Sequence, residues 1–198
     1  MEAKKYRLTE KQIKRGEKIL YQIKALKDFG MVKAGDLGGY IESEENLSQD
    51  NDAWVSGNAW VVSNARVSGN AWVSGDAQVY DNARVSGDAL VSGYAQVSGY
   101  AQVYGYAWVY GNAQVSGDAE VKSREDYIVF KNWWSSARYF TWTRSNNMWK
   151  VGCFFGTGKE LIKEAYNDSD ISGREYERIV RYVEEIMGEN YGNKEKAE

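Results

Sequence analysis

The sequence predicts a mainly β protein whose central part is a triangular parallel β-solenoid of about four regular coils plus an imperfect leading coil, followed by a small β-β-β-α-α domain. Two observations carry this prediction. A six-residue unit, Ala-x-Val-Ser-Gly-(Asn/Asp/Tyr), repeats without interruption from Ala53 to Val121. Alanine and valine fill all twelve of their positions, and the 198-residue chain contains no proline. A short fixed period is typical of solenoids, in which each repeat stacks on its neighbours.

Each position of the unit has a structural role. Alanine and valine are two residues apart and therefore point to the same side of an extended strand, whereas the residue between them points outward. The glycine and the Asn or Asp that follows it favour a turn, because these residues tolerate positive φ. Three such units close a triangular coil of eighteen residues, so the twelve hexads make four coils. The pattern resembles that of the left-handed β-helix in hexapeptide-repeat proteins, and the left-handed sense is expected from this resemblance.

With eighteen residues in a coil, the outward residues fall into three rows. These rows are Trp54, Trp72, Leu90, Trp108; then Trp60, Gln78, Gln96, Gln114; then Arg66, Arg84, Gln102, Glu120. The first row is a contiguous apolar strip that a monomer rarely leaves uncovered, so we predict an oligomer interface there. Two alternatives stay open: a groove for a planar ligand, with Arg66 or Arg84 binding phosphate, and packing against terminal segments of the same chain. Among the hexapeptide-repeat proteins that this coil resembles, trimers are common.

Three segments are expected: an N-terminal cap (1–36), the β-helix (37–121) and a small α+β domain (122–198). In the cap, residues 5–9 and 19–26 are predicted to form strands or a hairpin, with a helix over 10–27 as the alternative. Ile41 and Leu47 continue the inward row ahead of the first perfect repeat, which indicates an imperfect leading coil. A cap is needed because the ends of a solenoid expose strand edges.

The C-terminal domain shows strand and helix patterns. Strands are predicted over 127–130, 137–143 and 148–155. Two helices follow, each opened by a capping box, Thr157-Gly-Lys-Glu160 and Ser172-Gly-Arg-Glu175. The second helix is expected to stop near Gly188, with residues 192–198 frayed.

The composition argues against the chemistries known for comparable coils. The chain has no histidine, which disfavours both the histidine base of hexapeptide acyltransferases and the three-histidine zinc site of the related carbonic anhydrases. Cys153 is the only cysteine, which excludes an internal disulfide. In its predicted strand it is expected to be a small buried hydrophobic residue. We expect no catalytic residue, metal or cofactor, and therefore no enzyme.

Charge and hydropathy limit the partners. The net charge of −3 provides no basic field for nucleic acid. No apolar run reaches the length of a membrane span, and the first residues lack the features of a signal peptide. The sequence therefore predicts a cytoplasmic protein that binds neither nucleic acid nor membrane.

Several stretches resemble a family of phage- and prophage-encoded β-helix proteins, whose members are often labelled only as transferases or hypothetical proteins. The matching stretches are Ala25-Leu-Lys-Asp-Phe29, Lys33-Ala-Gly-Asp-Leu-Gly-Gly-Tyr-Ile-Glu42, residues 46–48, the hexads, residues 126–129, 152–154 and 156–157. The resemblance implies a phage or prophage origin and action inside the bacterial host cell, but no activity is common to the family. Where the family has a Gly-Ser-Arg element, this chain has Ser136-Ala-Arg138, so no site is carried over.

Residue chemistry nevertheless suggests one anion or nucleotide site. A glycine-flanked helix start attracts anions through its free N–H groups and dipole. If Ser135, Ser136 and Arg138 lie on a loop beside that helix start, they complete a phosphate pocket with tryptophan as a stacking wall. The candidate residues are Gly156, Thr157, Gly158, Ser135, Ser136, Arg138, Trp133 and Trp134. The alternative is structural: Thr157 is a helix cap, Arg138 a surface residue, and the tryptophans belong to the core.

The favoured hypothesis is a non-enzymatic, oligomeric binding or scaffold protein that counters host defence by binding a nucleotide-like signal or a host protein. The first alternative is an acyltransferase-like enzyme with a carboxylate base. The second is a structural virion component in which the coil serves as a rigid spacer.

Overall fold

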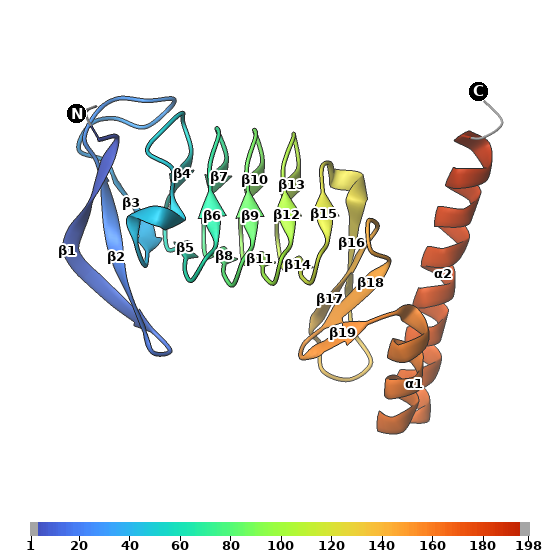
Figure 1. Ribbon diagram of the computed structural model, residues 1–198. Helices are drawn as coiled ribbons and strands as arrows, with labels where there is room; N and C mark the ends of the chain where they lie inside the picture. The colour runs from blue at the N-terminus through green and yellow to red at the C-terminus, as the bar shows by residue number, and fades with distance from the viewer. Residues whose placement is uncertain (1–3, 195–198) are drawn as a thin grey trace.

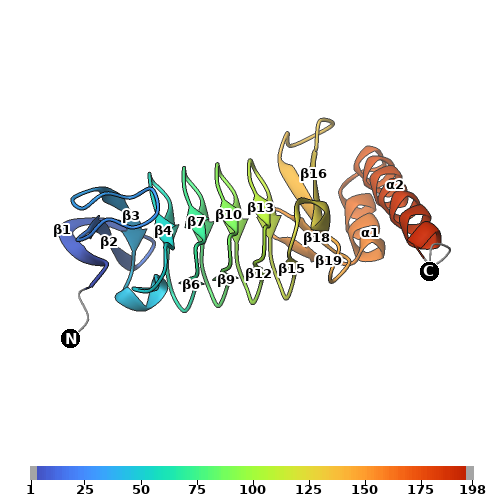
Figure 2. The ribbon, with the colours of Figure 1, turned by 90° about the horizontal axis from the view of Figure 1, so that it is seen from above.

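The computed structural model describes residues 4–194 (Figure 1). A hairpin, the stacked coils, a small sheet and two helices follow one another along one long axis, so the two ends of the described chain lie far apart. The helices lie on the side of the small sheet that faces away from the coils (Figure 2).

The coils contain thirteen strands, of which twelve have only two residues each. They are β3 (Leu37–Ile41), β4 (Trp54–Val55), β5 (Trp60–Val61), β6 (Arg66–Val67), β7 (Trp72–Val73), β8 (Gln78–Val79), β9 (Arg84–Val85), β10 (Leu90–Val91), β11 (Gln96–Val97), β12 (Gln102–Val103), β13 (Trp108–Val109), β14 (Gln114–Val115) and β15 (Glu120–Val121). Parallel pairing gives the prism three sides. We call them the tryptophan face (β4, β7, β10, β13), the glutamine face (β3, β5, β8, β11, β14) and the arginine face (β6, β9, β12, β15).

The predicted rows and the parallel β-solenoid are confirmed. Trp54 pairs with Trp72, which pairs with Leu90, and the other two faces keep the same eighteen-residue register. Every repeat alanine and valine is buried in one continuous core. Burying one valine contributes about 1.5–3 kcal/mol before the entropy of ordering the chain is subtracted.

The corners require backbone with positive φ. Gly69 has φ 66°, and a Cβ there would lie 2.9 Å from the nitrogen of Gly87 in the next coil, so stacking favours glycine at both positions. Ser63 and Asp81 adopt the same conformation with φ 59° at one corner of the first two regular coils.

The leading coil is longer than the regular ones. Ile41 and Leu47 are buried in the core as predicted, but they pair with Val61 and Val67, twenty residues further along the chain. The two extra residues widen the corner between Leu47 and Ala53, where Asn51 takes φ 53°.

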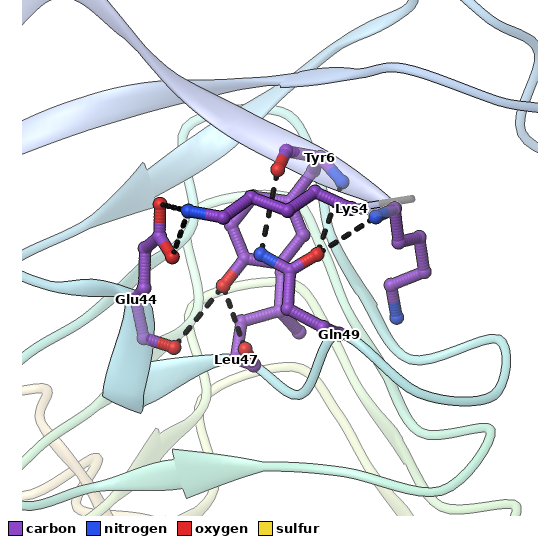
Figure 3. Close-up of polar contacts among 6 residues, drawn as sticks. Lys4, Tyr6, Glu44, Leu47 and Gln49 are labelled. Carbon is purple, nitrogen blue, oxygen red and sulfur yellow. Dashed lines mark hydrogen bonds and ion pairs between the residues drawn. The ribbon is translucent and has the colours of Figure 1, made fainter. Parts of the chain in front are cut away.

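The N-terminal segment is a hairpin of β1 (Tyr6–Arg15) and β2 (Lys18–Ala25), so the alternative helix over 10–27 is wrong. The hairpin forms because β2 also pairs antiparallel with β3 and thereby extends the glutamine-face sheet. Lys4 binds Glu44 at 2.8 Å, and the Tyr6 hydroxyl donates to the carbonyl of Leu47 at 2.6 Å (Figure 3). The Oε1 atom of Gln49 accepts the Lys5 N–H at 2.8 Å, so three contacts tie the chain start to the leading coil (Figure 3).

At the other end of the coils, hydroxyl groups satisfy the edge strands. The N–H groups of Tyr110 and Gln114 donate to the hydroxyls of Tyr127 (3.4 Å) and Thr141 (2.8 Å). The N–H of Glu120 donates to the Ser145 hydroxyl at 2.7 Å. One hydroxyl therefore caps one edge N–H on each face without continuing the coil.

The C-terminal domain is a four-stranded antiparallel sheet with two helices. Its elements are β16 (Tyr127–Lys131), β17 (Tyr139–Thr143), β18 (Met148–Val151), β19 (Phe154–Gly156), α1 (Gly158–Asp168) and α2 (Asp170–Lys194). One side of the sheet packs on the helices through Phe140, Trp142 and Trp149. On its other side, Thr141 contacts the last coil.

Three local predictions in this domain are wrong. Residues 148–155 form two strands, because Gly152 with φ 56° turns the chain and leaves Cys153 exposed at the tip. Helix α2 begins at Asp170, since the Ser169 hydroxyl accepts the N–H of Ser172 and starts the helix earlier. Helix α2 also continues through Gly188 to Lys194, because glycine lowers helix stability without ending a helix. Of the residues expected to fray, 195–198 lie outside the described part.

Candidate ligand-binding site

The helix half of the predicted anion site is already satisfied within the chain. Thr157 caps α1, and its hydroxyl accepts the N–H of Glu160 at 3.3 Å. The Glu160 carboxylate accepts the N–H of Thr157 at 2.8 Å, which lowers the pKa of Glu160. A carboxylate therefore already occupies the helix start formed by Gly156, Thr157 and Gly158, as a capping box predicts.

The loop half is organised around Asn132. Its Oδ1 accepts both the N–H (2.9 Å) and the hydroxyl (3.0 Å) of Ser135, and its Nδ2 donates to the Tyr176 hydroxyl at 3.1 Å. Trp134 packs edge-on against Tyr176 with ring centroids 4.9 Å apart, so it belongs to the core. Trp133 is 73% exposed.

The sheet register separates these two halves, so the composite phosphate pocket is not formed. Gly156 pairs with Trp149, which pairs with Trp142, at one end of the sheet. Arg138 and Ser136 precede β17 at the opposite end. Arg138 lies four residues along the sheet from Trp142, which is level with Gly156, and its strand is two strands away from β19. These offsets place Arg138 roughly 13 Å along and 10 Å across the sheet from Gly156.

Arg138 instead lies at the mouth of a groove on the glutamine face. This groove, which we call the glutamine groove, has a volume of about 310 Å³. It is lined by Gln78, Gln96, Gln114, Tyr94, Asn112, Arg138, Tyr139 and Gly152. The tip of the β1–β2 hairpin and the loop before β17 both project beyond this side of the coils, one at each end (Figure 1).

The groove carries polar groups with open hydrogen-bonding capacity. Its three glutamines lie on adjacent parallel strands, so their amides are spaced about 4.8 Å apart along the coil axis. In the described part of the chain, neither these amides nor the Arg138 guanidinium has a side-chain hydrogen bond or an ion pair. Tyr94 is 63% exposed, and the lining contains no carboxylate. The groove is therefore lined by a row of uncharged amides, with one cation and aromatic rings at its edge.

Fewer side chains of the tryptophan row are exposed than predicted. Tyr6 and Phe29 cover Trp54, with ring centroids at 6.4 and 5.4 Å, and leave it 2% exposed. The prediction of an exposed interface residue is thus wrong for Trp54, because the chain start folds back over it. At the other end, the Arg124 guanidinium lies 4.0 Å above the Trp108 ring.

Trp72, Leu90 and Trp108 remain partly exposed. Three partly covered side chains do not by themselves provide the roughly 800 Å² per partner of a stable interface. An oligomer interface centred on this row stays a prediction.

The described residues 4–194 contain no group of three His, Cys, Asp or Glu side chains placed to hold a metal ion. Among the same residues, no helix combines the length and the apolar character that a membrane span needs.

Fold and period together define a parallel β-solenoid protein. A family model described as the YdcK β-solenoid repeat matches residues 77–93 and 83–99, within the regular coils. The comparison with curated proteins gives no match.

Two features were absent from the sequence prediction, one in the site region and one at the ends of the coils. The contribution of Arg138 to the glutamine face depends on how the sheet docks on the last coil, which no local pattern specifies. The matched 3₁₀ turns at Glu44–Asn46 and Arg124–Asp126 were detectable, because Ser43 and Asn46 recur as Ser123 and Asp126.

Proposed function

We propose that this protein is a non-enzymatic binding scaffold of phage or prophage origin. It acts in the cytoplasm of the bacterial host, where it binds a segment of a host protein along the glutamine groove and thereby counters host defence. The observation that carries the proposal is a row of amides next to a guanidinium, none of which has a side-chain partner among the described residues. Unpaired hydrogen-bonding groups in a groove are the usual basis of specific recognition.

The backbone of an extended polypeptide has hydrogen-bonding groups that match those of this row. Side-chain amides both donate and accept hydrogen bonds, as backbone amides do. A carboxylate of the ligand would pair with Arg138 in a charge-assisted contact, and an apolar side chain would cover the Tyr94 ring. The groove extends over three coils but encloses only about 310 Å³, which favours an elongated ligand over a compact nucleotide.

The carboxylates of the repeat all have hydrogen-bonding roles in the coil. Each of them accepts a hydrogen bond from within the chain, which accounts for their presence without a catalytic role. The pairs are Asp76 with Asn58, Asp81 with the N–H of Gly99, Asp88 with Asn70, Asp118 with Asn146, and Glu120 with Tyr104.

Peptide display against the purified protein, followed by fluorescence polarisation of the selected peptides, tests the proposal. We expect peptides that contain a carboxylate, and about tenfold or greater weakening by Arg138→Gln or by neutralising that carboxylate. Gln96→Ala should weaken binding, whereas Gln102→Ala makes the same change on the arginine face and should not. Failure to select any peptide, or equal affinity for the Arg138→Gln variant, contradicts the proposal.

A further inference from the structure

The arginine face carries a second group of open polar side chains, away from the glutamine groove. Arg66 and Arg84 lie directly opposite each other on paired parallel strands, and both are exposed. Gln102 follows them in the same row. The adjacent corner contributes Asn64, Asn82 and Tyr100, and the six residues line a hollow of about 530 Å³.

The register places two like charges on adjacent strands. Adjacent parallel strands lie about 4.8 Å apart, and like charges directly opposite each other destabilise a sheet. In the described part of the chain, no carboxylate forms an ion pair with Arg66 or Arg84. Asp81, at the same corner, accepts the N–H of Gly99 at 3.1 Å. Among the described residues, no ion pair therefore offsets the repulsion between the two guanidinium groups.

The corner next to this pair presents a hydrogen-bond donor. Asn64 Nδ2 donates to Asn82 Oδ1 at 3.2 Å, which leaves the Nδ2 group of Asn82 without a hydrogen-bond acceptor among the described residues. Tyr100 occupies the same corner one coil further on and is 69% exposed. Two guanidinium groups, a free amide N–H and an open aromatic ring thus lie within one hollow.

We propose that this hollow binds a phosphate monoester that carries an aromatic base, that is, a nucleoside monophosphate. A dianionic phosphate placed between Arg66 and Arg84 offers three terminal oxygens to the two guanidinium groups and offsets their repulsion. The base stacks on Tyr100 and presents its edge to the Gln102 amide. The inference is independent of the proposed function, since the two sites lie on different faces and share no residue.

Calorimetric titration at low ionic strength with adenosine monophosphate, inorganic phosphate and adenosine tests this site. We expect the monophosphate to bind most tightly and adenosine most weakly. Arg84→Gln should weaken the monophosphate by about tenfold or more, because a hydrogen-bonded charge pair is lost. Tyr100→Leu should weaken the monophosphate and leave inorganic phosphate unchanged. Arg138→Gln, the equivalent change at the glutamine groove, should have no effect.

Thermal unfolding provides a second measurement that does not depend on a strong calorimetric signal. Without ligand, Arg84→Gln should raise the melting temperature, because it relieves the repulsion with Arg66. Phosphate should raise the melting temperature of the wild type more than that of the variant. Equal responses to phosphate in both proteins, or equal losses in Arg84→Gln and Arg138→Gln, overturn the assignment.

Discussion

The ammonium group of Lys5 makes the stability of the N-terminal end depend on pH. Lys5 is 1% exposed, and its Nζ donates to the carbonyl oxygens of Ala53 (2.8 Å), Asn51 (3.1 Å) and Asp50 (3.3 Å). The ring of Phe29 lies 5.0 Å from the same atom. Burial lowers the pKa of Lys5 from 10.5 to about 8, although Asp52 and Asp50 oppose the shift. The folded protein therefore releases this proton at a lower pH than the unfolded chain.

The sign of the effect follows from proton counting. Between pH 8 and 10.5 the unfolded chain binds more protons at Lys5 than the folded protein, so stability rises with pH across this window. The full shift corresponds to about 3 kcal/mol, of which about 2 kcal/mol is gained between roughly pH 7.5 and 9.5. Burial raises the pKa of Tyr6 above its ordinary 10.0, so stability falls again at higher pH.

Urea denaturation of the wild type and of Lys5→Met at several pH values measures this effect. The free energy of unfolding of the wild type should rise by about 2 kcal/mol relative to that of the variant between roughly pH 7.5 and 9.5. Lys4→Met is the control, because Lys4 is exposed and pairs with Glu44 on the surface. Parallel pH profiles for the wild type and Lys5→Met would refute the assignment of a buried, shifted ammonium.

Three further predictions concern the coil and its C-terminal end. Thr141→Val removes the acceptor of the Gln114 N–H and should lower the free energy of unfolding by about 1–3 kcal/mol, whereas an unchanged urea midpoint would contradict the edge-capping role. Gly69→Ala should destabilise the coil by about 1–3 kcal/mol, because its φ of 66° disfavours a Cβ that the next coil also crowds; a neutral result would show that the corner relaxes. Cys153 should react with a thiol reagent in the native protein at a rate close to that of a free thiol, and protection until unfolding would place it inside the sheet.

The solenoid could be predicted in detail because every coil repeats the same chemistry. Alternation assigned the alanines and valines to the core, and the eighteen-residue coil by itself placed Trp54 opposite Trp72. A strict repeat makes one local rule apply many times, so a register error in one coil would conflict with all the others.

The candidate site could not be predicted in the same way. Whether Trp54 is exposed depends on Phe29, which is distant in sequence and follows a hairpin of its own. The position of Arg138 depends on the register of β17 and on the Thr141 contact with the last coil. Both are tertiary contacts, and the sequence pattern identified the residue types without their neighbours.

Contacts within the chain occupy edge groups at both ends of the coils, so we place the function on the sides of the prism. Lys5 and Tyr6 bind edge carbonyls at the first coil, while the Tyr127, Thr141 and Ser145 hydroxyls bind edge N–H groups at the last. Contacts within the chain therefore engage edge groups at both ends of the coils, while β1 stays an edge strand of the glutamine-face sheet. On the tryptophan face, Phe29 covers Trp54, and the Arg124 guanidinium lies over the partly exposed Trp108 ring. Among the described residues of the coil, rows of open amide and guanidinium groups lie on the glutamine and arginine faces, so a partner that binds through polar contacts would engage one of them.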